Sequence, residues 1–389
     1  MLKRSAGVER RVVLWTCPRC VSTAFERCFV DLQGIKVFHE PYGIPFYSGK
    51  DKVHNRFDLQ DQHEKKWQQQ QQQQQTEQQQ QTEQQQQTEH SPGVTATSTT
   101  TTTGTGDAHA FEETKMERES DATGYVQGMD TFDGVLQCLR AEYEGCHTVF
   151  SKDMAYYLRG RETSQEFLQG FTHTFLIRHP CKAALSLWSK SRCEPDTGAP
   201  NKSTGWTFFD ITDIGFRELA AVFETVTALL QPAQGQKQAH DGSSSSSGSS
   251  SDNSLQRAKH TPTLLDADDM LSDPSLMVQA YCLLTGLPYS ASMLSWKPGP
   301  VHAWDTWPGW HDDALMSSGL QQRKPKPPPS VDEVVARMQA DVCTLPSHHE
   351  KYDWHEIRAE LQEAVKLYEQ LYARALTPAA ARAIVTPQP

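Results

Sequence analysis

The sequence lacks any apolar run long enough to cross a bilayer, and it lacks an excess of positive charge. Its 37 Lys and Arg residues stand against 48 Asp and Glu residues, for a formal net charge of -11. This balance argues against a general binder of nucleic acid or of acidic membranes, although basic residues can still gather around an anionic ligand. We therefore expect neither nucleic acid nor a membrane among its partners.

The cysteine content argues against a fold held together by a disulfide framework. There are nine cysteines, an odd number, and several of them lie within apolar helical patterns, including Cys138, Cys181 and Cys282. Such positions favour reduced core thiols over a disulfide framework. The first apolar strand pattern begins about eleven residues into the sequence, which leaves little room for a signal peptide. These features predict a cytoplasmic protein.

Low-complexity segments interrupt the chain. Residues 60–123 hold glutamine blocks separated by Thr-Glu pairs and then a threonine run, and residues 234–259 hold serine runs. Segments of this kind bury too little apolar surface to offset the entropy of ordering, so we expect two disordered insertions. The remaining residues, roughly 300, suffice for one large α/β domain. We place that domain at 11–376 and expect residues 377–389 to form a flexible tail.

One stretch near the N-terminus organises the rest. Residues 12–15 form a short apolar, β-branched run typical of a buried strand, and from Phe25 the apolar residues recur at helical spacing. In the turn between them, Ser22 or Thr23 can cap the helix. The amides of the first helical turn, the positive end of the helix dipole and the Arg19 guanidinium then meet at one point. The sequence predicts an anion site there.

Other interpretations of this turn exist. Simple helix capping would account for Ser22 and Thr23. The turn lacks the Gly-x-x-x-x-Gly-Lys-Ser/Thr pattern of a Walker A loop, and an arginine stands where a phosphate-binding loop needs a cation. It also contains Cys17 and Cys20 in a Cys-x-x-Cys arrangement at a strand-helix junction, which is where thioredoxin-like dithiols lie.

Two later strand ends carry similar chemistry. The apolar strand 172–177 runs into Arg178, a proline suited to the first helical turn, and Ser186 on the helix that follows. Arg178 has the alternative of a structural ion pair. The strand 35–38 ends in His-Glu-Pro, which leaves Glu40 at the carboxyl edge where open α/β sheets bind ligands. Glu40 has the alternative of pairing with a neighbouring basic group.

These residues resemble those of the sulfotransferases that use 3′-phosphoadenosine 5′-phosphosulfate (PAPS). The turn 16–23 looks like their 5′-phosphosulfate loop, in the branch that reads Pro-Arg-x-x-Ser-Thr. Arg178 with Ser186 eight residues later looks like their 3′-phosphate motif, and the segment 265–288 looks like their late strand and helix. The likeness covers about residues 11–319 without the insertions. It implies a three-layer, P-loop-like α/β fold with a central, mainly parallel sheet flanked by helices.

The resemblance also implies roles for single residues. Arg19 neutralises the sulfuryl and 5′-phosphate oxygens, and Ser22 and Thr23 bind the 5′-phosphate. Arg178 and Ser186 hold the 3′-phosphate of PAPS, which acts as co-substrate. No metal is required, because protein donors alone can stabilise the transferring group. The histidines 39, 173 and 179 share no metal-ligand spacing either, so we expect no metal site.

Departures from the family pattern decide the remaining roles. Many cytosolic members have a histidine base two residues after a lysine on the third strand, but Lys152 is followed by Asp153 and a methionine. In other branches of the family a glutamate after the second strand is the base, and Glu40 matches that placement. The resemblance therefore implies Glu40 as the base and Lys152 as the group that steadies charge on the leaving phosphate. Cys20 and Val21 replace the usual small polar residue and glycine of the loop, so a catalytically silent nucleotide-binding protein is the alternative. The expected acceptor is a small molecule or a glycan.

Overall fold

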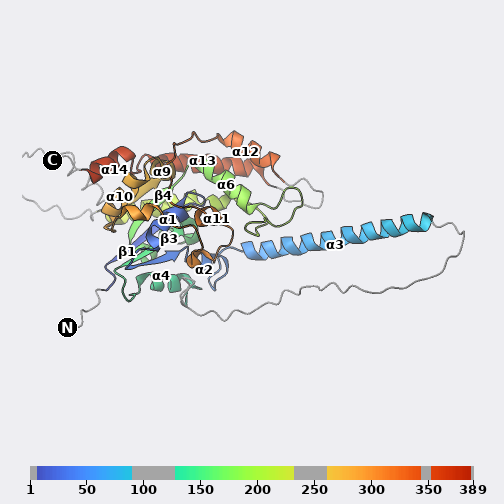
Figure 1. The fold of residues 1–389 in the computed structure, drawn as a ribbon, viewed down its shortest axis with the longest axis horizontal. Coiled ribbons are helices and arrows are strands. Elements are labelled where there is room, and N and C mark those ends of the chain that lie inside the picture. Colours follow the sequence, from blue (N-terminus) through green and yellow to red (C-terminus); the bar gives the residue numbers. More distant parts are fainter. Residues whose placement is uncertain (1–6, 90–127, 232–260, 343–351, 387–389) are drawn as a thin grey trace, which may run out of the picture.

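The computed structural model describes residues 7–89, 128–231, 261–342 and 352–386 (Figure 1). Within these residues, five strands form one sheet in the order β2-β3-β1-β4-β5, and every pair is parallel. The prediction of a central, mainly parallel sheet is therefore confirmed. The strands are β1 (Arg10–Thr16), β2 (Ile35–His39), β3 (Thr148–Met154), β4 (Thr172–Ile177) and β5 (Thr263–Asp266).

Helices cover both faces of this sheet, as predicted for three layers. Because side chains alternate along a strand, Val13 and Trp15 of β1 enter one core and Val12 and Leu14 enter the other. The first core packs against α4 (Phe132–Arg140), α6 (Pro180–Ser191), α7 (Phe216–Leu230), α12 (Val331–Ala340) and α13 (Trp354–Tyr372). The second packs against α1 (Ser22–Val30), α9 (Ala267–Ser272), α10 (Pro274–Thr285) and α14 (Pro378–Val385).

The strand order places the ends of several strands side by side. The chain leaves β1 for β2 at the sheet edge, returns to β3 beside β1, and then crosses to β4 on the other side of β1. Such a reversal is the point at which open α/β sheets form a ligand crevice, outside the carboxyl ends of the strands. In the register of the sheet, Thr16 lies beside Met154 and Leu176, and His39 lies beside Lys152.

Short helical segments lie in the loops that connect these elements. They are α2 (Gly43–Tyr47), η1 (Ala155–Leu158), α5 (Gln165–Leu168), η2 (Ile211–Ile214), η3 (Ala291–Leu294), η4 (His302–Trp304) and α11 (Asp312–Leu315). The segment 301–320, which contains η4 and α11, is anchored at its far end because the Leu320 amide donates to the Leu294 carbonyl at 3.0 Å. This segment brings late residues onto the turn that follows β1.

The glutamine-rich stretch differs from the expectation of disorder as far as residue 89. Residues 60–89 belong to the long helix α3 (Arg56–Glu89), which projects away from the domain (Figure 1). Glutamine and glutamate are good helix formers, and the Gln60 and Trp67 side chains tie the base of the helix to carbonyl groups of the 197–205 loop. No helix in the described parts of the chain combines the length and apolar character needed to span a bilayer. Residues 90–123 and 234–259 of the predicted insertions lie outside the described residues.

The predicted flexible tail is wrong for residues 378–385, which form α14. The Thr377 side chain caps this helix by accepting from the Ala380 amide at 3.2 Å, and Pro378 occupies its first turn. Ala381 is fully buried within the second core, where α14 packs on α10. The helix is ordered because it covers apolar surface of α10.

We expect Ala381→Arg to destabilise the fold by about 3 kcal/mol, because an arginine cannot fit between α14 and α10 without displacing packed atoms. Ala383→Arg on the exposed side of the same helix serves as the control and should change stability by less than about 0.5 kcal/mol. Urea denaturation of both variants measures the difference. Equal stabilities would mean that this helix contributes no packing.

Candidate active site

The turn after β1 has an unusual backbone. Arg19 and Val21 have φ angles of 63° and 68°, in the left-handed region that favours glycine. Such conformations cost of the order of 1–3 kcal/mol each and gather at functional sites. Val21 occupies the N-cap position of α1, with no side-chain cap, so the prediction that Ser22 or Thr23 caps the helix is wrong. The first turn of α1 therefore presents its amides without a capping side chain.

Arg19 joins the two predicted anion motifs. Its Nε donates to Ser186 Oγ on α6 at 2.9 Å, and its Nη1 donates to the Trp310 carbonyl at 2.9 Å. Arg178, which directly follows β4, donates from Nη1 to the Arg19 carbonyl oxygen at 2.9 Å. The structure thus brings together the residues of both motifs, which are separated by about 160 positions in the sequence.

The charges around Arg19 favour an anion. Burial lowers the pKa of Arg19, the carboxylate of Asp313 opposes this effect, and the nearby Arg178 guanidinium lowers the pKa further. The Asp313 carboxylate lies 3.6 Å from Arg19 Nη2, but its side chain is 90% exposed. The Nε atom of Arg178 is buried and has no hydrogen-bond partner among the described residues. Two adjacent guanidinium groups with one weakly held carboxylate form an electrostatic arrangement that a multiply charged anion would complete.

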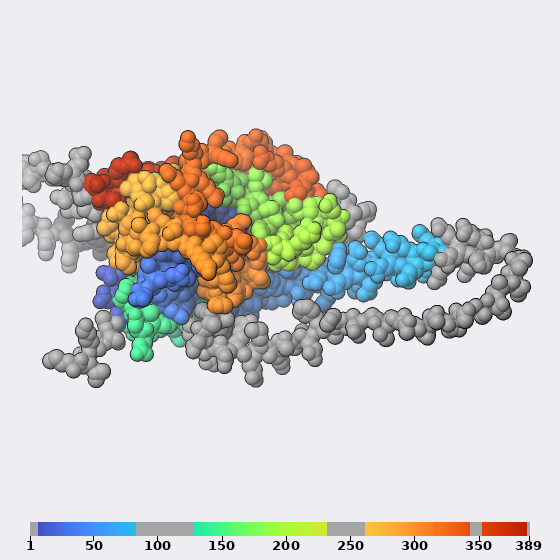
Figure 2. Space-filling view, viewed as in Figure 1, coloured from blue at the N-terminus to red at the C-terminus, as the bar shows by residue number. Residues whose placement is uncertain are grey.

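These residues open into a single cavity of about 350 Å³. Figure 2 shows a hollow between the orange and green parts of the surface, with blue atoms of the N-terminal segment inside it. Arg323, which the sequence analysis missed, adds a third arginine to the cavity wall. The predicted residues that line the cavity are Arg19, Val21, Ser22, Thr23, Glu40, Arg178 and Ser186, whereas Cys20 and Lys152 are completely buried behind it.

Glu40 is held by a buried ion pair. Lys152 Nζ contacts Glu40 Oε1, Tyr157 Oη donates to Oε2 at 3.0 Å, and the Glu40 backbone has a φ of 48°. Burial alone would raise the pKa of Glu40, but Lys152, His39 and the Tyr157 hydrogen bond outweigh it, and the pKa falls below its ordinary value. Glu40 is therefore ionised at neutral pH. Glu40 therefore pairs with a neighbouring basic group, as the alternative interpretation of this residue expected. It also lines the cavity.

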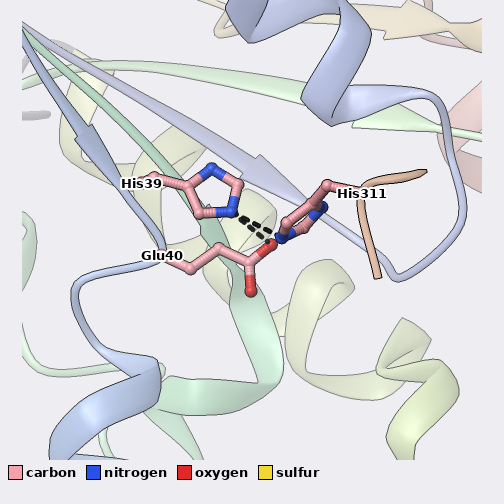
Figure 3. A group of neighbouring side chains, drawn as sticks. All are labelled: His39, Glu40 and His311. Atoms are coloured by element: carbon pink, nitrogen blue, oxygen red, sulfur yellow. Dashed lines mark hydrogen bonds and ion pairs between the residues drawn. The ribbon is translucent and has the colours of Figure 1, made fainter. Parts of the chain in front are cut away.

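A pair of histidines lies beside Glu40 (Figure 3). His39 Nε2 is 2.9 Å from His311 Nε2 and 3.6 Å from Glu40 Oε1. On the other side of its ring, His39 Nδ1 is 2.6 Å from Glu26 Oε2. Burial lowers the pKa of His311 well below its ordinary value, and His39, Lys152 and Arg19 add to that effect. The sequence could not reveal the pair, because 272 positions separate the two histidines.

His39, Glu40 and His311 also offer three donor atoms within 4.8 Å of one another. Two imidazoles and a carboxylate suit several transition metals. In the structure, however, the Lys152 ammonium already contacts Glu40, and the two imidazoles are hydrogen-bonded to each other. The expectation that no metal is required stays a prediction.

Cys17 and Cys20 are poorly suited to thiol-disulfide exchange. Both are fully buried, and Cys20 Sγ donates to the Cys17 carbonyl oxygen at 2.8 Å. Burial raises the pKa of both thiols. A redox-active cysteine needs an accessible thiolate with a lowered pKa, so this geometry argues against the oxidoreductase alternative.

We expect Lys152→Met to destabilise the fold by about 3–5 kcal/mol at about pH 7, because Glu40 becomes a buried charge without its cationic partner. In the wild type the Glu40 pKa lies below its ordinary value of 4.5, so the stabilisation is present above that pH and is lost as the pH falls through the folded-state pKa. In the variant, burial instead favours the protonated carboxyl. The loss should therefore shrink at about pH 3.5.

Urea denaturation at both pH values measures this effect. Lys52→Met, at an exposed pair with Asp58, is the control and should change stability by less than about 1 kcal/mol. The double variant Glu40→Gln/Lys152→Met should regain part of the lost stability. A loss for Lys152→Met that does not depend on pH would contradict an ionised Glu40.

Comparisons with known proteins find short or distant similarities. No family model matches the chain. Branched-chain-amino-acid aminotransferase-like proteins 1 and 2 of Arabidopsis thaliana are 34% and 31% identical to it over 67 residues, which is 17% of this chain and 12% of each relative. A solved sulfotransferase domain from the curacin biosynthetic pathway aligns with 59% of this chain and 66% of its own length, at 13% identity and a TM-score of 0.27. Matches this short or this distant do not establish a family.

Proposed function

We propose that this protein is a sulfotransferase that moves a sulfuryl group from PAPS to an acceptor hydroxyl. The proposal rests on the meeting of Arg19 and Arg178 in one cavity, with Ser186 bonded to Arg19. A donor with phosphate groups at both the 3′ and 5′ positions needs cations and hydroxyl groups from more than one turn. The two turns after β1 and β4 supply them at neighbouring strand ends.

The donor is held as follows. The 5′-phosphosulfate lies on the turn of Arg19, Cys20 and Val21 and on the first residues of α1, Ser22 and Thr23. Its oxygens replace the exposed Asp313 carboxylate at Arg19. The 3′-phosphate lies against Arg178 and Ser186, and Arg323 on the cavity wall adds a further positive charge.

The transfer uses the charges next to this loop. Glu40 takes the proton of the acceptor hydroxyl as the acceptor oxygen forms a bond to sulfur. The bond between sulfur and the 5′-phosphate oxygen breaks, and its electron pair stays on that oxygen. Once Glu40 is protonated, it no longer neutralises Lys152, and the ammonium group stabilises the charge on the leaving phosphate.

The acceptor side of the cavity favours an uncharged molecule. All arginines that line the cavity belong to the donor side of the proposal, and six aromatic residues line the cavity as well. Flat rings and aliphatic groups pack well on such surfaces. A small molecule with an uncharged ring therefore suits the cavity better than a charged glycan. The aromatic residues are Tyr47, Tyr156, Tyr157, Trp206, Trp307 and Trp310.

A catalytically silent nucleotide-binding protein is the second candidate. One observation favours it: both oxygens of Glu40 are engaged, one by Lys152 and the other by Tyr157. A base in this state must exchange a partner before it reaches an acceptor proton.

Adenosine 3′,5′-bisphosphate should raise the thermal midpoint of the wild type. Arg19→Ala and Arg178→Ala should each weaken its binding about tenfold to hundredfold, because each removes charge-assisted hydrogen bonds of about 1.5–3 kcal/mol. Arg217→Ala, at an exposed pair with Glu360, is the control and should respond like the wild type. Thermal shift titrations give the affinities. If the wild type shows no shift, or the two site variants match it, the proposed donor site is wrong.

Glu40→Gln should lower sulfuryl transfer about 10²- to 10⁴-fold, while bisphosphate binding persists. The assay follows radiolabelled sulfate from PAPS into a panel of uncharged phenols, alcohols and sugars. Transfer by the wild type that survives Glu40→Gln would reject Glu40 as the base. Nucleotide binding without transfer to any acceptor would favour the silent protein.

A further inference from the structure

A continuous chain of hydrogen bonds runs from Glu26, in the middle of α1, to Thr23, at the start of the same helix. Glu26 Oε1 accepts from Trp304 Nε1 at 3.2 Å, and Glu26 Oε2 lies 2.6 Å from His39 Nδ1. His39 Nε2 lies 2.9 Å from His311 Nε2. His311 Nδ1 lies 3.3 Å from the Thr23 hydroxyl, which faces the cavity. Each member except Thr23 is buried.

The directions of these bonds follow from the partners. The indole N–H of Trp304 is always a donor, and a carboxylate accepts on both oxygens, so His39 donates from Nδ1 to Glu26. If His39 is neutral, its Nε2 must then accept from His311 Nε2–H. His311 Nδ1 is left with a lone pair and accepts from the Thr23 O–H. The hydroxyl hydrogen of Thr23 therefore points away from any ligand in the loop.

One added proton reverses the chain without moving a heavy atom. A protonated His39 donates from Nε2 to His311 Nε2, so His311 carries its hydrogen on Nδ1 and donates it to Thr23 Oγ1. The Thr23 O–H is then available to an anion. His311 stays neutral in both states, as its burial requires.

We infer that Glu26, His39 and His311 form a positioning relay that couples the binding of the nucleotide's 5′-phosphate at Thr23 to the uptake of a proton by His39. This inference rests on the proposed function only in its choice of ligand. The phosphate needs the Thr23 donor, and its negative charge in turn favours a cation on His39. By linkage, the affinity for the nucleotide falls as the pH rises.

Charged groups face His39 from several elements. The carboxylates of Glu26 at 2.6 Å and Glu40 at 3.6 Å lie next to it, from α1 and from the end of β2. Lys152 on β3 is paired with Glu40. Arg27 of α1 lies over the Trp304 ring at 5.7 Å, and Arg19 and Lys190 act on the His311 side.

Isothermal titration of the wild type with adenosine 3′,5′-bisphosphate, in buffers of different ionisation enthalpy, counts the protons taken up. At about pH 8 the phosphate itself is fully ionised, since its second pKa is about 6. We expect net uptake of up to one proton per nucleotide, and an affinity that weakens as the pH rises, by at most about tenfold per pH unit.

Three variants isolate the relay. Thr23→Val keeps the shape of the side chain but loses the hydroxyl, so it should bind about tenfold to hundredfold more weakly and without proton uptake. Thr23→Ser, the matched control, should keep the uptake. His39→Asn retains a donor to Glu26 but cannot carry the proton, so its binding should not depend on the relay or on pH in this range.

The outcomes separate this inference from the proposed function. Nucleotide binding without proton uptake, or unchanged uptake in Thr23→Val, overturns the relay and leaves the donor site intact. No nucleotide binding by the wild type overturns both. A stoichiometric Zn²⁺ in the purified protein that is lost in His311→Gln also overturns the relay, because the histidines would then be ligands.

Discussion

The arrangement of the site depends on one constraint, the parallel pairing of β1 with β3 on one side and β4 on the other. This pairing puts the carboxyl ends of the strands at one edge, and four charged residues of the site lie at or near a strand end. Arg19 follows β1, Glu40 follows β2 and Arg178 follows β4, while Lys152 lies two residues before the end of β3. A change in strand order would separate these groups, although each local motif would persist.

Buried charge is the cost of this convergence. Lys152, Glu40 and Glu26 are all nearly inaccessible, and their desolvation is offset only because each finds a partner of opposite charge or a hydrogen-bond donor. The left-handed backbone at Arg19, Val21 and Glu40 adds local strain at the same place. Strain and buried charge that gather beside one cavity are typical of a functional site.

The segment 301–320 completes the site from the far end of the chain. It supplies Trp304 to Glu26, His311 to His39, and the Trp310 carbonyl and Asp313 to Arg19. These contacts join the turn after β1 to the histidine pair and to the aromatic residues of the cavity. The proposed donor and the proposed proton relay therefore meet on the same short turn after β1.

The sequence by itself determined the fold class and the strand-turn-helix units that carry Arg19 and Arg178, because strand-turn-helix periodicity and the types of residue in the turns are local. It also placed Glu40 correctly at a strand end. It erred where tertiary contacts override local composition. The tail folds as α14 because α10 offers an apolar surface, and Val21 takes the N-cap because the turn adopts a left-handed backbone. Only the tertiary structure decided that Arg19 reaches Ser186, that Lys152 neutralises Glu40, and that His311 lies against His39. Each of those contacts joins residues more than a hundred positions apart. The pattern of residues within one segment does not indicate which distant residue that segment will contact.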